Sequence, residues 1–198
     1  MTDWRQWHEQ YDGDLQGRLL AVQDVIGSWL DAAPEGTLRI TSACAGDGRD
    51  LAGVVPGHRR AGDVEAVLVE LDADLADTAS VSFPTIQGDA GELSTYLGLP
   101  PADLLLLCGI FGNISDDDVR QTIAHASRLC AWGATVVWTR HRRSPDLTDS
   151  IRAWFLDEGW AAQSFLSAGP DSWSVGVARL TVDPLPFEAP LRLFTFTR

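Results

Sequence analysis

A loop rich in small residues, SACAGDGRDL, spans Ser42 to Leu51 and has a composition suited to ligand binding. Its two glycines, Gly46 and Gly48, follow an apolar run that starts at Leu38. Glycines at such a place let the backbone approach a ligand closely, and the order strand, loop, helix is the one that a phosphate or nucleotide site needs. The stretch therefore predicts a cofactor-binding loop.

An acidic residue follows this loop at a spacing typical of nucleotide sites. Glu70 comes 24 positions after Gly46 (70 − 46), close to the spacing of about 20 residues between a glycine loop and a ribose-binding carboxylate. A carboxylate at that point accepts hydrogen bonds from two vicinal hydroxyls at once. Asp72 is the alternative ribose ligand if the strand before it is shifted.

The frame of the glycines bears on which nucleotide fits. In the dinucleotide fingerprint G-x-G-x-x-G the third glycine lies where a helix packs closely on a strand. Here the frame reads Gly46, Gly48, Leu51. A leucine at the third position counts against a nicotinamide cofactor.

Two helices are expected before the loop. The first carries four large side chains at the helical spacing i, i+3, i+4 and i+7, namely Trp4, Trp7, His8 and Tyr11. The second has apolar residues at helical spacing from Leu15 to Leu30 and ends where Pro34 and Gly36 break the pattern. We expect residues 1–34 to form an N-terminal helical cap on a core of residues 35–198, in a single domain.

Strand-like apolar runs alternate with helical segments through the middle of the chain. The expected strands are Leu38 to Cys44, Ala66 to Asp72, Phe83 to Ala90, Asp103 to Phe111 and Ala134 to Arg140. Near-continuous apolar runs of this kind are typical of strands buried on both faces of a parallel sheet. One of the intervening helices should open at Ser115, with Asp118 three positions on to complete a capping box.

The alternation stops after Gly159. Ala162 to Ala168 and Ser172 to Val182 are separated only by a Gly-Pro-Asp turn, so they should pair antiparallel. The predicted fold is therefore α/β and doubly wound. Its mostly parallel seven-stranded sheet carries an antiparallel terminal hairpin that adds a reversed strand to its edge, with helices on both faces. The final LRLFTFTR could form one more short strand.

The order of elements and the glycine loop resemble those of the class I S-adenosylmethionine-dependent methyltransferases, over Leu38 to Val182. In that family the sheet has seven strands with the last one antiparallel, and an acidic residue followed by alternating glycines closes the first strand. The matching positions here read Ser42, Cys44, Gly46 and Gly48. Ser42 and Cys44 depart from the family pattern.

The resemblance implies S-adenosylmethionine as the cofactor. Glu70 would take the ribose hydroxyls, Leu71 would lie on the adenine, Asp89 would accept from the exocyclic amine and the Ala90 N–H would face the ring. The end of the fourth strand would surround the sulfonium. The full implied set is Ser42, Cys44, Ala45, Gly46, Gly48, Glu70, Leu71, Asp89, Ala90, Cys108, Gly109 and Phe111.

The implied reaction is transfer of a methyl group to a small-molecule acceptor by in-line displacement. A base is needed only if the acceptor arrives protonated, and the candidates are His8, Tyr11 and His141. The basic stretch Thr139 to Arg143 would follow the fifth strand, where it either holds an anionic acceptor or is a solvated loop. Two alternatives stay open: a noncatalytic module that binds S-adenosylmethionine or another nucleotide, and an NAD(P)-dependent oxidoreductase.

The composition of the chain limits the kinds of partner that we expect it to bind. The 28 acidic residues against 15 basic ones give a net charge of −13, which disfavours nucleic acid because its binding depends on cationic side chains. The four histidines and three cysteines have no metal-ligand spacing. No apolar stretch approaches the length of a membrane span, so we expect a cytoplasmic protein without a membrane partner. A homodimer could form if LRLFTFTR were an exposed strand.

Overall fold

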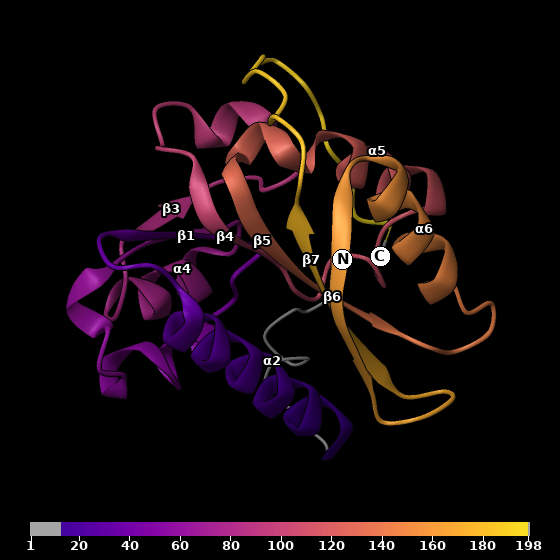
Figure 1. Cartoon of the computed structure of the whole chain (residues 1–198), viewed down its shortest axis with the longest axis horizontal. Coiled ribbons are helices and arrows are strands. Elements are labelled where there is room, and N and C mark those ends of the chain that lie inside the picture. Colours follow the sequence, from indigo (N-terminus) through magenta and orange to yellow (C-terminus); the bar gives the residue numbers. More distant parts are fainter. Residues whose placement is uncertain (1–12, 198) are drawn as a thin grey trace.

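The computed structural model describes residues 13–197, and they form a seven-stranded sheet flanked by helices (Figure 1). The order of strands across the sheet is β3-β2-β1-β4-β5-β7-β6. The strands are β1 Leu38–Ala43, β2 Val64–Glu70, β3 Thr85–Gln87, β4 Ala102–Leu107, β5 Cys130–His141, β6 Trp160–Ser167 and β7 Trp173–Leu180. The α-helices are α2 Gly13–Ala32, α3 Arg49–Ala52, α4 Ala73–Ser80, α5 Asp116–His125 and α6 Thr148–Asp157, and the short 3-10 turns are Val55–Gly57, Ala61–Asp63, Leu93–Tyr96 and Ala126–Leu129.

The first five strands are parallel, as the alternation predicts. The carboxyl ends of β1, β2, β3 and β4 therefore meet along one edge of the sheet. This edge carries the glycine loop and each of the acidic residues expected to contact a cofactor. The fold-class prediction of a doubly wound, mostly parallel sheet with an antiparallel hairpin is confirmed.

The reversed strand is not at the edge, where we expected it. β7 is antiparallel to both β5 and β6 and lies between them, so β6 is the edge strand. Burial explains the order, because five consecutive residues of β7 are buried whereas most of β6 is exposed. The more apolar strand of the hairpin occupies the interior position.

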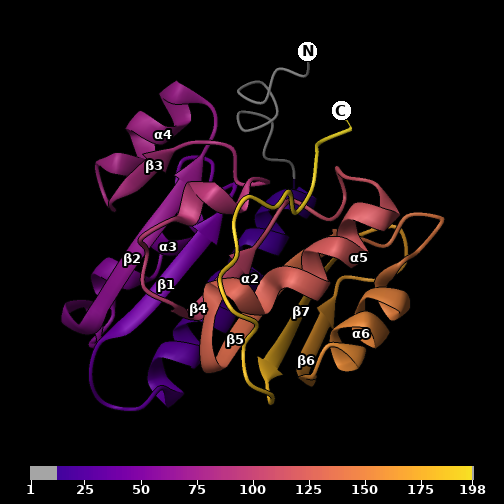
Figure 2. The same cartoon turned by 90° about the horizontal axis from the view of Figure 1, so that it is seen from above.

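Helices cover both faces of the sheet (Figure 2). The core on one face contains buried residues of α2 and α4, and the core on the other contains buried residues of α5 and α6. α5 begins as the capping pattern predicts, because the Ser115 Oγ accepts a hydrogen bond from the Asp118 N–H at 3.1 Å.

α2 is part of the core. Val22, Ile26 and Leu30 lie on one face of the helix, are fully buried and pack with apolar residues of β1, β2 and β4. The aromatic stripe with His8 and Tyr11 lies outside the described residues. The division into a cap of residues 1–34 and a core of residues 35–198 stays a prediction.

The C-terminal segment is not a strand, contrary to the expectation for LRLFTFTR. It makes two isolated bridges, Glu92 with Arg192 and Ile114 with Phe196. Its backbone N–H groups are used within the chain, since Leu193 donates to Gly91 and Thr197 to Asn113. The segment is therefore not the exposed strand on which the expected homodimer depended, and the dimer stays a prediction.

Within residues 13–197, no helix is both long enough and apolar enough to cross a membrane.

Candidate cofactor site

The glycine loop turns sharply as it leaves β1. Three alternating residues adopt positive φ: Cys44 at 53°, Gly46 at 58° and Gly48 at 79°. Cys44 carries a Cβ in this left-handed region, which costs about 1–2 kcal/mol relative to glycine. The departure from the family glycine at Cys44 thus keeps the backbone shape that a glycine would provide.

Gly48 is required at its position by close packing as well as by φ. A Cβ added to Gly48 would lie 2.9 Å from the Leu68 Cδ2 and 3.4 Å from the Ala79 Cβ. The loop is also closed by a hydrogen bond of 3.0 Å from the Gly48 N–H to the Ala45 carbonyl. Ala45 in turn donates to the Val69 carbonyl at 3.0 Å, which extends the pairing of β1 with β2.

Glu70 ties this loop to the next strand. Its Oε2 accepts from the Gly46 N–H at 2.8 Å, and its Oε1 accepts from the N–H groups of Leu71 and Asp72, both at 2.9 Å. The carboxylate is half-buried and held at a fixed place at the end of β2. An ionised carboxylate has about four acceptor positions, and the three backbone bonds leave one of them, on Oε2, for a ligand.

The two residues after Glu70 differ in accessibility. Leu71 is 61% exposed, an apolar side chain beside the loop. The Asp72 Oδ1 accepts from the N–H groups of Asp74 and Leu75 and caps α4. The Asp72 carboxylate is used to cap α4, so Glu70 rather than Asp72 is the ribose-binding candidate.

Asp89 lies beyond the end of β3, beside the same loop. Its Oδ1 accepts from the Gly91 N–H at 2.8 Å, and its Oδ2 accepts from the Arg192 Nη2 at 3.1 Å. Ala90 is buried, and its carbonyl accepts from the Tyr96 hydroxyl at 2.9 Å. The predicted turn is therefore well ordered by contacts within the chain.

The Cys44 thiol interacts electrostatically with Glu70 and Asp89. Burial raises the pKa of the Cys44 thiol well above its usual value, and the charges of Glu70 and Asp89 raise it further. The thiol is therefore neutral at pH 7. A neutral thiol is a poor nucleophile, so a structural role fits Cys44 better than a catalytic one.

Cys108 lies on the other face of the sheet from Cys44. Burial, the charge of Asp50 and a hydrogen bond with the Asp50 side chain raise the pKa of the Cys108 thiol, while Arg18 opposes the shift. Burial also raises the pKa of Asp50. The two cysteines thus pack in different hydrophobic clusters.

At the end of β4, the part of the chain that faces the candidate cofactor site is the backbone of Gly109. Gly109 has a φ of 76°, its N–H donates to the Thr139 Oγ1 at 2.8 Å, and a Cβ on Gly109 would have no neighbour within 4 Å. Phe111, by contrast, is fully buried and its ring packs with Trp138 and Phe155. The Phe111 side chain therefore points into the core, and a contact of Phe111 with the cofactor stays a prediction.

The remaining predicted residues are distributed as follows. Ser42 is buried inside β1, between Leu68 and Leu106 of the flanking strands. His141 ends β5, with its ring against the loop after β4: a Cβ on Gly112 would lie 3.1 Å from the His141 Cδ2. His8 and Tyr11 lie outside the described residues.

The basic stretch at the end of β5 is not a simple solvated loop. Arg140 is buried, donates to the Phe111 carbonyl and lies 3.6 Å from Asp116. Arg142 donates to Asp146 at 2.9 Å. Only Arg143 of the three arginines is exposed.

Two features of this site were missed by sequence reasoning. Arg192 comes from the far end of the chain, and Asp50 forms a buried contact with Cys108. LRLFTFTR was expected to form a short strand, but nothing in the sequence indicated that it would lie beside Asp89.

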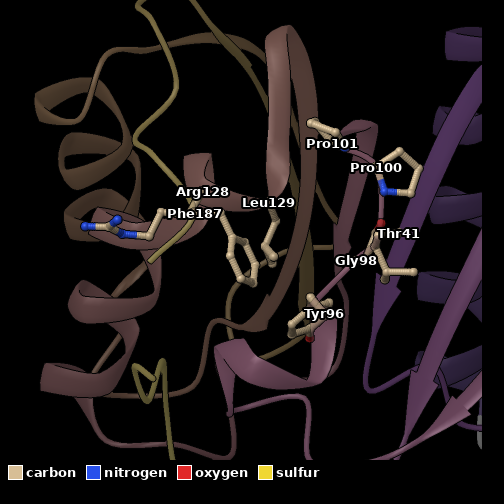
Figure 3. A pocket seen from close by; sticks show the side chains of 9 residues that line it. Thr41, Tyr96, Gly98, Pro100, Pro101, Arg128, Leu129 and Phe187 are labelled. Carbon is tan, nitrogen blue, oxygen red and sulfur yellow. The ribbon is translucent and has the colours of Figure 1, made fainter. Parts of the chain in front are cut away.

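A cavity of about 80 Å³ has Thr41 of β1 among its lining residues (Figure 3). It is lined by Tyr96, by Pro100 and Pro101 just before β4, and by Leu129 just before β5. None of the predicted cofactor residues lines it. Residues 13–197 also contain no cluster of three or more histidine, cysteine or acidic side chains suited to a metal ion.

Comparison with solved structures identifies the fold. The magnesium protoporphyrin IX methyltransferase of Synechocystis PCC 6803, with bound S-adenosylmethionine, has a TM-score of 0.68 and 16% identity over 91% of this chain and 92% of that chain. The N-methyltransferase NodS of Bradyrhizobium japonicum WM9, in complex with S-adenosyl-L-homocysteine, has a TM-score of 0.64 and 10% identity over 88% and 91%.

Other neighbours are larger. An O-methyltransferase family protein of Burkholderia thailandensis has a TM-score of 0.65 and 16% identity over 84% of this chain, which spans only 56% of its length. No protein-family model matches the sequence, and no curated protein matches it. At these identities the similarity establishes the fold: the chain has the Rossmann-like fold of the class I S-adenosylmethionine-dependent methyltransferases.

Proposed function

We propose that this protein binds S-adenosylmethionine at the carboxyl edge of β1 to β4 and transfers its methyl group to a small-molecule acceptor. One observation carries the proposal. The Glu70 carboxylate, at the end of β2, binds the glycine loop through the Gly46 N–H, and Asp89 follows the end of the neighbouring parallel strand β3. Such an arrangement suits a nucleoside that offers hydroxyl donors at one end and an amine at the other.

The residues present fit this cofactor. Glu70 is already oriented by three backbone N–H groups and keeps one acceptor position on its Oε2, so it can accept from a ribose hydroxyl without rearranging. The exposed Leu71 offers an apolar surface next to it for a planar base. The free space beside Gly109 at the end of β4 leaves room for the methionine part of the molecule.

The cofactor supplies a methyl group that its sulfonium already activates. The protein's contribution is then to hold the acceptor in line with that methyl group and to exclude water. Residues that end β4 and β5 are the described ones closest to that task. His141, packed on the loop after β4, is the described candidate for taking a proton from an acceptor that arrives protonated.

The other predictions about partners are part of this proposal. A net charge of −13 supports a small acceptor over nucleic acid. We propose a cytoplasmic protein without a membrane partner, in which His8 and Tyr11 help to enclose the acceptor. A module that binds the cofactor without turnover is the main alternative, since Ser42 and Cys44 depart from the family pattern.

Glu70 provides the test of the cofactor site. Glu70→Ala should weaken binding of S-adenosylhomocysteine tenfold or more, which corresponds to about 1.4 kcal/mol, as measured by calorimetric titration. Glu70→Gln should show a smaller loss, because it keeps one accepting oxygen. Glu65→Ala is the matched control, since Glu65 is an exposed acidic residue on the same strand.

Equal affinity in Glu70→Ala and wild type would remove the ribose assignment. Turnover is tested by incubating the enzyme with S-adenosylmethionine and a small-molecule cell extract. Steady release of S-adenosylhomocysteine supports methyl transfer, whereas binding without any release over a broad panel of acceptors favours the noncatalytic alternative.

A further inference from the structure

The last residues of the chain form part of the wall around Asp89. Residues 191–197, here called the C-terminal strap, run in extended form beside the turn after β3. The Leu93 N–H donates to the Leu191 carbonyl at 2.8 Å, and the Leu193 N–H donates to the Gly91 carbonyl at 2.7 Å. These two bonds flank Arg192 and fix its backbone.

The strap is held by packing on its other face. Leu193 and Phe194 are 2% and 1% exposed and belong to the core under α5. A Cβ on Gly91 would lie 2.3 Å from the Phe194 carbonyl oxygen, so a glycine is needed for the strap to approach this closely. The position of Arg192 is therefore set by the core and does not depend on its own ion pairs.

The Arg192 guanidinium joins two carboxylates of the turn. Its Nη2 contacts the Asp89 Oδ2 at 3.1 Å and also the Glu92 Oε1, and its Nη1 donates to the Phe194 carbonyl at 3.0 Å. Asp89 is held on its other oxygen by the Gly91 N–H. Both oxygens of Asp89 are thus fixed, although 38% of its side chain is still exposed.

We propose that Arg192 is a positioning residue for Asp89 and that it sets how strongly the site distinguishes an adenine with its 6-amino group from a purine without one. This inference rests on the proposed S-adenosylmethionine function. A carboxylate oxygen accepts more than one hydrogen bond, so the Asp89 Oδ2 can bind Arg192 and a ligand amine together.

Arg192 can have this effect because the χ2 torsion of aspartate has a broad distribution and does not fix the plane of the carboxylate by itself. With Arg192 in place, the plane of the Asp89 carboxylate is fixed by a donor on each oxygen. Without Arg192, only the bond to Gly91 is left, and the Oδ2 is free to turn away from the ligand. The loss should therefore fall on recognition of the amine and not on binding of the rest of the cofactor.

The experiment compares two ligands by calorimetric titration: S-adenosylhomocysteine and its analogue in which hydrogen replaces the 6-amino group. Wild type should bind the amino form about tenfold more tightly, as expected for one hydrogen bond to a charged acceptor. Arg192→Gln should reduce this ratio to about two- to threefold. Arg192→Lys should give a ratio in between, since it keeps the charge but lacks the planar fork.

Glu92→Gln is the matched control, because it removes an ion pair from the same arginine and leaves the contact with Asp89 in place. Its ratio should equal that of wild type. Thermal melts verify that each variant is folded, and because the side chains of this ion pair are 44% and 38% exposed, small changes in stability are expected.

A purely structural role for Arg192 would weaken both ligands equally, and an unchanged ratio in Arg192→Gln would overturn the inference. A wild-type ratio near one would also overturn it, because Asp89 would then not contact the amine. Failure of wild type to bind S-adenosylhomocysteine at all would instead refute the proposed function.

Discussion

At the residue scale, the site depends on backbone shape in the glycine loop. Cys44, Gly46 and Gly48 all have positive φ, a region that side chains with a Cβ rarely adopt. Cys44 tolerates it at a cost of about 1–2 kcal/mol, with its thiol packed against the core of one face. Gly48 differs because its neighbours leave no room for a side chain.

Gly48→Ala should therefore destabilise the protein by about 1–3 kcal/mol, from strain at positive φ and from the contact with Leu68. Urea unfolding measures the change. Gly62→Ala is the control, because a Cβ there would meet nothing within 4 Å and no positive φ is involved. It should change stability by less than about 0.5 kcal/mol. Equal effects of the two substitutions would contradict the role assigned to Gly48.

The buried thiols predict a loss of stability at alkaline pH. Burial raises the pKa of Cys44, Cys108 and Cys130 in the folded state. Above about pH 8.5 an unfolded cysteine loses its proton while the folded one keeps it, so the folded state binds more protons and its stability falls as pH rises. The stabilisation is complete below about pH 8.5 and is lost progressively above it.

The measurement is urea unfolding between pH 7.5 and pH 10. Each thiol contributes a slope of up to about 1.4 kcal/mol per pH unit. The sequence contains no lysine, so lysine titration does not obscure the effect. Cys130→Ala should make the decrease of unfolding free energy with pH less steep, by the contribution of one thiol. A flat profile in wild type, or an unchanged slope in the variant, would contradict the assignment.

Residue types and spacing predicted that Glu70 would lie beside the glycine loop, and the hydrogen bond from the Gly46 N–H confirms that position. Glu70 could be identified because its distance from the glycine loop follows from the βαβ geometry itself. The direction of a side chain after a strand depends on the turn that follows, and this could not be read from the sequence. Phe111 therefore points into the core, and Asp72 caps α4.

At the scale of elements, the layers follow from the position of apolar residues. α2 packs on the sheet through Val22, Ile26 and Leu30, each four positions from the next and each fully buried. This stripe was visible in the sequence. Which face of the sheet it would cover was not, because helical periodicity identifies a buried face but not its partner.

Ile26→Ala tests whether α2 is part of the core or only an attached cap. It should cost about 2–5 kcal/mol, since it removes a fully buried side chain. Leu20→Ala on the same helix is the control, because Leu20 is 53% exposed, and it should cost less than about 0.5 kcal/mol. Urea unfolding of both variants gives the comparison. A small effect of Ile26→Ala would mean that α2 contributes little to the core.

The C-terminal segment shows where the prediction of secondary structure from local sequence fails. We expected LRLFTFTR to form a short strand, and Leu193 and Phe194 within it are buried. It forms two bridges rather than a strand because its backbone bonds go to loops after β3 and β4. Such long-range partners cannot be seen in local sequence.

At the scale of the whole molecule, the strand order brings residues from all parts of the chain to one edge of the sheet. The glycine loop, Glu70, Asp89 and the C-terminal strap with Arg192 meet there although up to 146 positions (192 − 46) separate them. Parallel strands make this possible, because their carboxyl ends share an edge. The fold class was predictable from the alternation of elements, whereas the acceptor depends on loops that vary within one fold.

The most direct test of the account is a thermal melt of the wild-type protein with S-adenosylmethionine, S-adenosylhomocysteine, NAD and NADP in parallel. A ligand at 100 times its dissociation constant that binds only the folded state adds about 2.7 kcal/mol of stability. The account predicts a higher melting temperature with the two sulfur ligands and no change with the nicotinamides. A shift with NAD or NADP alone would contradict it and would assign Glu70 to the ribose of a different cofactor.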